Sequence, residues 1–358
     1  MKFKSILVFP SNMAESSTVI KMANELGLRV VLATSEPVFA HREKAGVISL
    51  PYITEANFDQ CFFRLLAEQE ISLVFSPHAG IWSHLQSLST NSDSPVTFSV
   101  CNESPFETNW FKYGAAYEWA RACVDDKSLP LSDAAVLLPV SRYANLHYGY
   151  NQIPGQNDDI KLQLLASVAR AAPLGDIVEI GCLYGRSAFA LAWLAKCHDI
   201  GPLICVDPWE ATSIQNQGDG AALLNRQAFE IDWQKVFRCF IASLSGFDNV
   251  NYIRKPSGLA CDDYRFAAAS EGVCTEEFGN TEVRGEISII HIDGNHRYED
   301  VRLDIDTWLP FVKEGGWVLI DDYLWAFGDG PRRAGDEVLQ EREVRTAFVF
   351  GDTLCIQL

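Results

Sequence analysis

An acidic residue and a histidine follow an apolar run in the stretch SIIHIDGNHRYED, residues 288–300. Asp293 comes directly after the run, and His296 follows three residues later, after a glycine and an asparagine. A carboxylate can bind a metal ion, and an imidazole can accept a proton from an alcohol near neutral pH. We therefore take Asp293 and His296 as candidate catalytic residues, the first as a metal ligand and the second as a general base.

Two further aspartates follow the next predicted strand, in WVLIDDY. A predicted crossover helix, EDVRLDIDTWLPFV, separates this strand from the one that ends at Asp293. Neighbouring strands lie about 4.8 Å apart, so we expect Asp293, Asp321 and Asp322 to meet at one edge of a sheet. Three uncompensated carboxylates would repel one another, and a divalent cation would remove that repulsion. All-oxygen ligands favour Mg²⁺, with Mn²⁺ or Ca²⁺ as alternatives.

Each of these residues also has an ordinary structural interpretation. Adjacent aspartates at a strand end are often only a solvated turn, and a lone loop histidine is more often structural than catalytic. His291 lies inside the apolar run, and we expect it to be structural. The spacing D-x-x-H, followed by D-D after one helix and one strand, favours a metal ion and a base together.

A second motif, VEIGCLYGRS at residues 178–187, is typical of a strand, a glycine turn and the start of a helix. Gly181 lets the chain leave the strand tightly, and Gly185 lets the helix pack close to a bound ligand. Glu179 precedes both glycines, and Asp207 ends the next predicted strand 28 residues later. A dinucleotide-binding fold has the different spacing G-x-G-x-x-G.

These two acids suit S-adenosylmethionine as the cofactor. That molecule carries a cationic sulfonium and an α-ammonium, so a carboxylate at the first turn complements its charge. Asp207 can accept hydrogen bonds from both ribose hydroxyls. The structural alternatives are a capping or salt-bridged acid for Glu179 and a surface turn acid for Asp207. The strand–turn–helix order around the two residues favours the cofactor interpretation.

The pattern E-x-G-x-x-x-G-x-S, then VDPW, then a strand ending in IDG resembles class I S-adenosylmethionine-dependent methyltransferases. Leu183 stands where a middle glycine is common, and the variant EIGxxxGRS occurs among small-molecule O-methyltransferases. The resemblance implies that the adenine is met near Lys255–Ser257, so Ser257 is a further candidate. It also implies cofactor binding by Glu179, Gly181, Gly185, Ser187 and Asp207.

The D-x-x-H and D-D motifs together resemble the macrocin and mycinamicin type of sugar O-methyltransferase, which is related to the cephalosporin hydroxylase group. The resemblance covers roughly residues 150–358 and includes GDGPRRAGDEVL, residues 328–339. It implies that one further acidic ligand lies upstream, at an unassigned position. Catechol-type O-methyltransferases usually have a lysine where His296 stands. The resemblance implies metal binding by Asp293, Asp321 and Asp322, with His296 as general base.

The elements that must position these residues form two α/β segments. Residues 1–104 alternate strand and helix patterns and predict a smaller N-terminal parallel α/β domain. Its predicted strands are KSILVFP, LRVVLATS, VISLPY, ISLVFSP and VTFSVC. Its predicted helices are AESSTVIKMANELG, with Gly27 as a C-cap, ANFDQCFFRLLAEQE, and a short one from about Gly80.

Residues 105–150 are predicted to be a connector that covers a pocket, with a helix near Phe111–Cys123 and an aromatic stretch after it. Residues 151–358 predict a Rossmann-like class I methyltransferase domain, a mostly parallel sheet with a final antiparallel hairpin at Gly351. Residues 258–285 are polar and predict an insertion with two short helices. The helix that follows His296 is expected to place Val301, Ile305, Trp308, Leu309 and Val312 on one face and to end at Gly315 and Gly316.

The composition of the chain excludes some classes of binding partner. The net charge of −18 argues against a nucleic-acid substrate and against a polybasic membrane anchor. The ten cysteines include no C-x-x-C pair, which favours buried reduced thiols in a cytoplasmic protein over a zinc ribbon or a redox motif. The N-terminal apolar stretch is too short for a signal sequence, and no run approaches the ~20 residues that span a bilayer.

We therefore expect a metal-assisted O-methyltransferase that acts on a hydroxyl of a small-molecule or glycan acceptor. Two alternatives stay open: a methyltransferase that keeps the cofactor without a metal, and a cofactor-binding module without transfer activity. The N-terminal domain faintly resembles the leading domain of ATP-grasp enzymes at FPSNMAESS. We expect it to serve acceptor recognition or contacts in a homo-oligomer.

Overall fold

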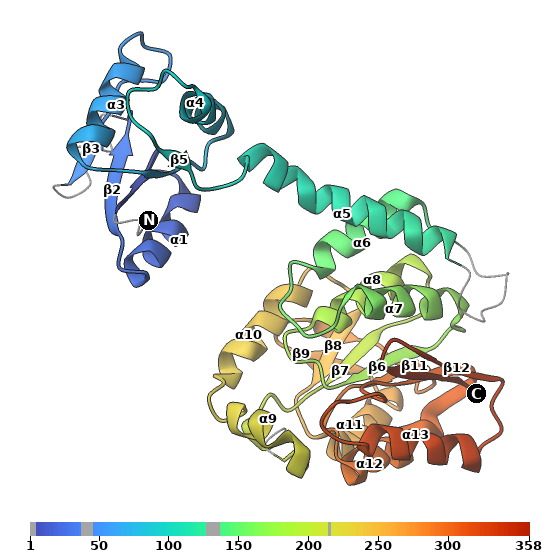
Figure 1. Cartoon of the computed structure of the whole chain (residues 1–358). Coiled ribbons are helices and arrows are strands. Elements are labelled where there is room, and N and C mark those ends of the chain that lie inside the picture. The colour runs from blue at the N-terminus through green and yellow to red at the C-terminus, as the bar shows by residue number, and fades with distance from the viewer. Residues whose placement is uncertain (1–4, 37–45, 127–136, 214–215) are drawn as a thin grey trace. The chain divides into compact units, whose positions relative to one another are not determined.

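The computed structural model describes residues 5–36, 46–126, 137–213 and 216–358. The chain divides into two compact units, residues 1–114 and 115–358 (Figure 1). Each unit has its own sheet and its own hydrophobic core, so each is described by itself.

The first unit is a parallel sheet of five strands in the order β3-β2-β1-β4-β5. Its core is rich in phenylalanine, with Phe58 and Phe62 of one helix packed beneath the sheet. The predicted small parallel α/β fold is confirmed, and Gly27 follows the first helix with a φ of +70°. The strands are β1 Ser5–Val8, β2 Arg29–Thr34, β3 Val47–Ser49, β4 Leu73–Phe75 and β5 Ser99–Val100. The helices are α1 Ala14–Glu25, α3 Phe58–Glu68 and α4 Ala79–Thr90.

The second unit contains a seven-stranded sheet in the order β13-β14-β12-β11-β6-β7-β8. Its central strands are parallel, and β14 pairs antiparallel with both β12 and β13, as the sequence predicts. The chain runs from β6 outward to β8, then returns to β11 on the other side of β6, so the sheet has a switch point between β6 and β11. The strands are β6 Asp176–Ile180, β7 Leu203–Val206, β8 Val250–Ile253, β11 Ile287–Ile292, β12 Val312–Ile320, β13 Thr346–Phe350 and β14 Thr353–Gln357.

Helices cover both faces of this sheet (Figure 1). One face packs against α7, α8 and α10, and the other against α11, α12 and α13. The helices are α5 Pro105–Asp125, α6 Val140–Tyr150, α7 Asp159–Ala171, α8 Arg186–Cys197, α9 Ala222–Gln227, α10 Trp233–Leu244, α11 Ser257–Ala268, α12 Tyr298–Trp308 and α13 Gly330–Glu341.

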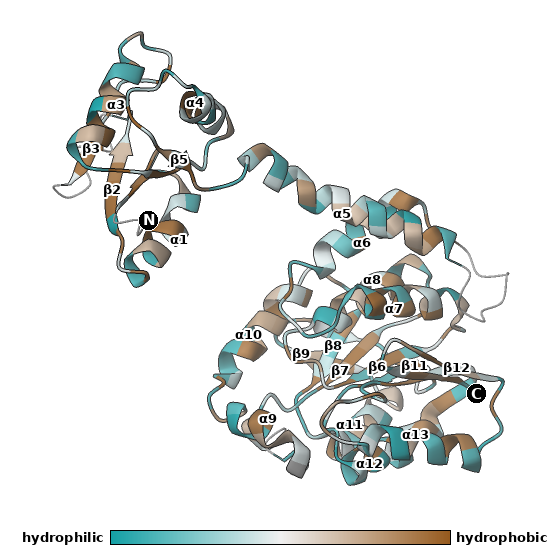
Figure 2. Ribbon diagram, in the orientation of Figure 1, coloured by the Kyte–Doolittle hydropathy of each residue, from teal (hydrophilic) through white to brown (hydrophobic). Residues whose placement is uncertain are grey.

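Alternation along the strands decides which side chains meet which helices. Ile289 of β11 faces the core beneath α7 and α8, whereas Ile290 faces the core beneath α12 and α13. Figure 2 shows that the central strands are mostly hydrophobic and that α13 carries many hydrophilic residues. By the same alternation, His291 must lie on the α7 side, where it becomes part of the site described below.

Three local predictions are extended or corrected by the structure. The helix predicted near Phe111–Cys123 is confirmed as part of α5, and the aromatic stretch that follows contributes a second helix, α6. Residues 258–285 hold one helix, α11, and an antiparallel pair, β9 Val273–Thr275 and β10 Gly279–Thr281, in place of two short helices.

The third correction concerns the helix after His296, which ends at Trp308 and not at the two glycines. A short 3-10 turn, Leu309–Phe311, contains a proline and joins α12 directly to β12. Gly315 and Gly316 lie inside β12, because the strand begins at Val312. Among the described residues, no helix is both long and apolar enough to cross a membrane.

Gly181 is required by a close approach between two chain segments. It has a φ of +83°, and a Cβ at this position would lie 2.0 Å from the carbonyl oxygen of Asp293. Gly279 has a similar φ of +70° and has open space where a Cβ would stand. A Cβ at Gly279 would therefore meet only the strain of a left-handed backbone. A Cβ at Gly181 would meet the same strain and also collide with Asp293.

We predict that Gly181→Ala lowers the free energy of unfolding by about 2 kcal/mol more than Gly279→Ala does, because both pay the backbone cost and only the first overpacks the chain. Chemical denaturation of the full-length protein measures both. Equal losses would contradict the close packing of Gly181 against Asp293.

Candidate active site

The candidate residues gather at the edge of the sheet where the parallel strands end. The amide of Asp293 donates to the carbonyl of Ile180 at 2.8 Å, and the amide of Asp321 donates to the carbonyl of Ile292 at 2.9 Å. These bonds continue the strand pairing one residue beyond β6, β11 and β12. Consequently the turn after β6 lies directly beside Asp293, and Asp293 lies beside Asp321.

Asp207, at the end of β7, holds the glycine turn. Its Oδ2 accepts hydrogen bonds from the amides of Cys182 at 2.9 Å and Leu183 at 3.1 Å, and its Oδ1 accepts one from the amide of Trp209 at 2.6 Å. Burial raises the pKa of Asp207, and the three amides partly offset this. Leu183 has a positive φ of 46°, which the bond to Asp207 helps to fix. The structure thus brings Asp207 to the turn, as the cofactor interpretation requires, and its contact with ribose stays a prediction.

Glu179 is fully buried within the sheet and faces the neighbouring strand β11. Its Oε1 accepts a hydrogen bond from Nδ1 of His291 at 2.9 Å. Its Oε2 is buried without a hydrogen-bond partner among the described residues. A buried carboxylate oxygen without a donor is costly, so Glu179 has a free acceptor for a cationic ligand.

His291 connects Glu179 to Asp321. Its Nε2 lies 3.2 Å from Oδ2 of Asp321, and the imidazole is fully buried between the two carboxylates. Burial by itself lowers the pKa of His291. The combined effect of the two carboxylates is larger and raises the pKa to about 10. The imidazole is therefore a cation at neutral pH, which agrees with the structural role expected from the sequence.

Asp321 is fully committed to other residues of the chain. Its Oδ1 accepts from Nζ of Lys161, from Oγ1 of Thr353 at 2.9 Å and from the amide of Asp322 at 2.9 Å. With His291 on Oδ2, the carboxylate has four donors, three on Oδ1 and one on Oδ2. Burial raises the pKa of Asp321, but Lys161 and His291 hold it well below the usual range. Its predicted role as a metal ligand stays a prediction, and Lys161 already supplies a positive charge at Oδ1.

A second group lies on the open side of Asp321 and consists of Asp293, His296 and Asp322. One ligand atom from each lies within 4.8 Å of the others. Nε2 of His296 is 2.9 Å from Oδ2 of Asp322 and 4.0 Å from Oδ1 of Asp293. The three side chains are 14–26% exposed, so they border solvent without being surface groups. The structure therefore brings together three residues that the sequence assigned to the reaction.

The imidazole of His296 has no aligned hydrogen bond. Both of its ring nitrogens are buried without a hydrogen-bond partner among the described residues, although carboxylate oxygens are close. Burial by itself lowers the pKa of His296. The combined effect of Asp293 and Asp322 is larger and raises the pKa to about 9. The ring of Trp325 packs over it, with centroids 4.6 Å apart. His296 is thus held in place and still has nitrogen atoms available to a ligand.

These residues fit a divalent cation. Burial, and to a smaller extent the charge of Asp321, raise the pKa of Asp293 to about 7, while His296, His291 and Lys161 oppose this rise. Two carboxylates beside one imidazole, at 2.9 Å and 4.0 Å from its Nε2, are a donor set that suits Mg²⁺ or Mn²⁺. Among the described residues, the potential metal groups here join Asp293 either with His296 and Asp322 or with His291 and Asp321. Within the part of the chain that the structure describes, no acid upstream of His291 joins these groups.

The remaining predicted cofactor residues lie around the same edge. Gly185 precedes α8 with a φ of +87°, and a Cβ at this position would lie 3.1 Å from the ring of Phe240 in α10. Ser187 is buried in the first turn of α8. Ser257 begins α11 and donates its hydroxyl to Asp304 of α12, a contact that sequence spacing did not indicate. Cofactor binding by these three residues stays a prediction.

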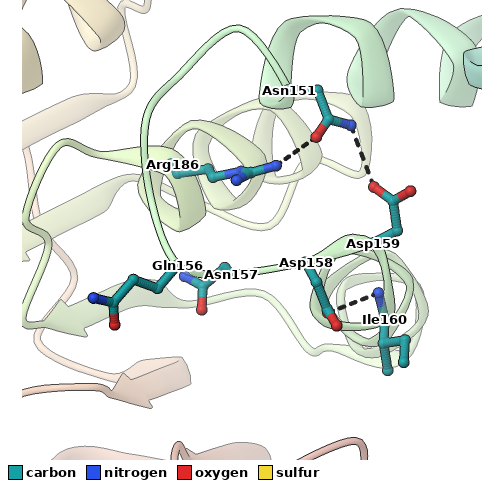
Figure 3. Close-up of a pocket in the computed structure, with 7 residues that line it drawn as sticks. All are labelled: Asn151, Gln156, Asn157, Asp158, Asp159, Ile160 and Arg186. Carbon is teal, nitrogen blue, oxygen red and sulfur yellow. Dashed lines mark hydrogen bonds between the residues drawn. The ribbon is translucent and has the colours of Figure 1, made fainter.

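A polar pocket of about 440 Å³ adjoins the glycine turn (Figure 3). Arg186 closes one side of it, where it donates to Asn151 and, at 3.2 Å, to the carbonyl of Gly155. Asp158 caps the start of α7 by accepting from the amides of Ile160 and Lys161 at 2.9 Å. The pocket is lined by Asn151, Gln156, Asn157, Asp158, Asp159, Ile160 and Arg186.

Lys161 is the principal residue that sequence reasoning missed. It stands in the first turn of α7, one residue beyond the pocket wall, and is 4% exposed. A signal was present, because Lys161 begins the apolar i, i+3, i+4, i+7 stripe with Leu164, Leu165 and Val168. A lysine at a core position of a helix indicates a buried anionic partner.

Comparisons with known proteins agree with this geometry. A family model described as a methyltransferase domain matches residues 178–323, which include the glycine turn and both aspartate motifs. No curated protein matches the sequence of the chain.

Solved structures give more distant likenesses. The O-methyltransferase NovP has 17% identity and a TM-score of 0.41, over 56% of this chain and 79% of that one. The calicheamicin methyltransferase CalS11 has 14% identity and a TM-score of 0.43, over 74% and 99%. MycE from the mycinamycin biosynthetic pathway, solved with Mg and SAH, has 16% identity and a TM-score of 0.30, over 51% and 44%. All three scores lie below 0.5, so the conclusions below rest on the family match and on the geometry.

The second unit contains a methyltransferase domain. Residues 178–323 carry the family match, and the sheet is mostly parallel with a final antiparallel hairpin. The protein is therefore a methyltransferase.

We predict that Asp207→Ala weakens binding of S-adenosylmethionine about tenfold or more, because the variant loses an anionic acceptor and frees the glycine turn. Isothermal titration calorimetry measures the dissociation constant. Asp248→Ala is the matched control, since it removes an exposed carboxylate that forms an ion pair with Lys196. An unchanged dissociation constant in Asp207→Ala would contradict the assignment.

Proposed function

We propose that this protein transfers a methyl group from S-adenosylmethionine to a hydroxyl of a sugar, a glycan or a hydroxylated natural product. The observation that carries the proposal is the meeting of Asp293, His296 and Asp322 beside the glycine turn. That turn is the part of the domain where the donor is expected, so the acceptor hydroxyl and the donor would share one edge of the sheet.

The first requirement of the reaction is removal of a proton from an alcohol. His296 has two ring nitrogens without aligned partners, and its position is fixed by Trp325 on one side and by two carboxylates on the other. A positioned imidazole of this kind contributes typically about 10²–10⁴-fold to a rate. We assign His296 as the general base and the neighbouring Asp293 as the residue that orients the hydroxyl.

Asp293 and Asp322 are the residues that would hold a divalent cation, most simply Mg²⁺. Such a cation lowers the pKa of a bound hydroxyl and fixes its position. In the protein alone, the two carboxylates favour the protonated imidazole of His296. An added positive charge between them would favour the neutral form that a base requires.

The donor is assigned to the residues around the glycine turn. Oε2 of Glu179 is a buried acceptor without a donor, and the α-ammonium of S-adenosylmethionine is a group that could satisfy it. Asp207 is the candidate ribose acceptor, and Ser257 lies after β8, where the adenine edge is expected. We propose that Gly181, Gly185 and Ser187 shape the backbone around the donor.

The polar pocket near α7 favours a hydroxylated acceptor over an apolar one. Amides, carboxylates and a guanidinium line it, and these groups donate to and accept from hydroxyls. Its volume of about 440 Å³ lies within the ordinary range for small-ligand sites. Ile160 of its wall is followed in the chain by Lys161, which contacts Asp321, so the pocket lies close to the carboxylates.

A metal-independent reaction is the second candidate. One specific observation favours it: Lys161 and His291 already neutralise Asp321, so the repulsion among three carboxylates that called for a cation is partly removed. In that case His296 and the positioning of the two reactants would supply the rate enhancement.

Methyl transfer to a panel of glycosides and nucleotide sugars tests the function. Mass spectrometry should show products heavier by one methylene group, formed only when S-adenosylmethionine is present. Chelation with EDTA should lower the rate about 10²-fold or more, and added Mg²⁺ should restore it. A rate that survives EDTA would select the metal-independent reaction.

We predict that His296→Ala lowers turnover about 10²-fold or more while the affinity for S-adenosylmethionine changes little. His198→Ala is the control, since His198 caps the far end of α8. Steady-state kinetics and calorimetry measure the two quantities. A large loss of cofactor affinity in His296→Ala would instead mark the residue as structural.

A further inference from the structure

Four buried side chains form a row of alternating charge beneath the reaction site. Glu179, His291, Asp321 and Lys161 follow one another with contacts of 2.9 Å, 3.2 Å and a close ion pair. Each is at most 4% exposed. The row crosses from β6 through β11 to the end of β12 and is completed from α7.

This row is electrically balanced without any bound ion. Two carboxylates alternate with an imidazolium and an ammonium, so each buried charge has an opposite neighbour. A lone buried charge is strongly unfavourable, and the opposite charges in this row offset part of that cost. Lys161 is also 3.2 Å from Oδ1 of Asp352 and donates to Thr353, so two further groups of the final hairpin hold it in place.

Asp321 in turn fixes the conformation of Asp322. Asp322 has a positive φ of 52°, which is uncommon for a residue other than glycine. Its amide donates to Oδ1 of Asp321 at 2.9 Å, and its carboxylate then lies 2.9 Å from Nε2 of His296. The position of Asp322 beside His296 therefore depends on the carboxylate of Asp321, which forms an ion pair with Lys161.

We propose that Lys161 is the permanent counter-cation of Asp321, so that Asp321 is a positioning residue and the cation-binding carboxylates are Asp293 and Asp322 alone. The inference rests on the proposed function and deepens it. In this proposal, the ammonium group of Lys161 compensates the charge of Asp321, whereas a site with three carboxylate ligands would use a metal ion for that purpose.

The structure gives this assignment a direct test, because removal of Lys161 should create a new metal group. Ligand atoms of His291, Asp293 and Asp321 already lie within 4.8 Å of one another. Without the ammonium, Asp321 would be a buried, unpaired carboxylate in that group. A divalent cation would then compensate it.

The experiment measures equilibrium binding of Mn²⁺ to the full-length protein by electron paramagnetic resonance of the free ion. The variants are Lys161→Met and the double variant Lys161→Met with Asp321→Asn. The double variant removes both charges, and the asparagine oxygen can still accept from the amide of Asp322. Lys196→Met is the control, because Lys196 pairs with the exposed Asp248.

We expect Lys161→Met to bind Mn²⁺ about tenfold or more tightly than the wild type, because an unpaired carboxylate becomes available. The double variant should return to within about threefold of the wild type. A Lys161→Met affinity equal to that of the wild type would overturn the proposal. A loss of about tenfold or more in the double variant would overturn it too, since Asp321 would then be a ligand itself.

Two further outcomes are decisive. If Lys161→Met does not fold, the double variant alone decides, with wild-type affinity supporting the proposal and a loss of about tenfold overturning it. If the wild type binds no Mn²⁺, the metal in the proposed function fails, while the gain or absence of gain in Lys161→Met still decides the role of Lys161.

Discussion

The buried ion pair between Lys161 and Asp321 is the interaction on which the site depends. It joins the first turn of α7 to the end of β12, two segments 160 residues apart in the chain. Because both side chains are removed from water, neither can be unpaired cheaply. The pair therefore fixes α7 against the end of β12, next to Asp293, His296 and Asp322.

This arrangement divides the charged residues into two layers with different tasks. The inner layer, from Glu179 to Lys161, is balanced and buried, and its side chains hold one another. The outer layer, Asp293, His296 and Asp322, borders solvent, and the ring nitrogens of His296 have no aligned hydrogen bond among the described residues. Rigid support beneath reactive groups is what precise positioning of two reactants requires.

Sequence reasoning predicted the strands well, because apolar runs that end in glycine or aspartate have few other interpretations. It also placed Asp293, His296 and Asp322 together, since the ends of neighbouring parallel strands must meet. It missed the partner of Asp321, because Lys161 is distant in the chain and no local pattern names the anion that a core lysine will meet. The end of α12 was misplaced for a different reason: Pro310 ends the helix, whereas Gly315 and Gly316 lie in the strand.

The central claim is that a cation and a methyl donor share the edge formed by β6, β11 and β12, with Asp321 held apart by Lys161. A crystal structure with S-adenosylhomocysteine and Mn²⁺, examined by anomalous scattering, tests it most directly. We expect an anomalous peak between Asp293 and Asp322, beside the sulfur of the donor, with the ion pair between Lys161 and Asp321 intact. A peak bound by Asp321 with Lys161 displaced, or a donor located away from this edge, would contradict it.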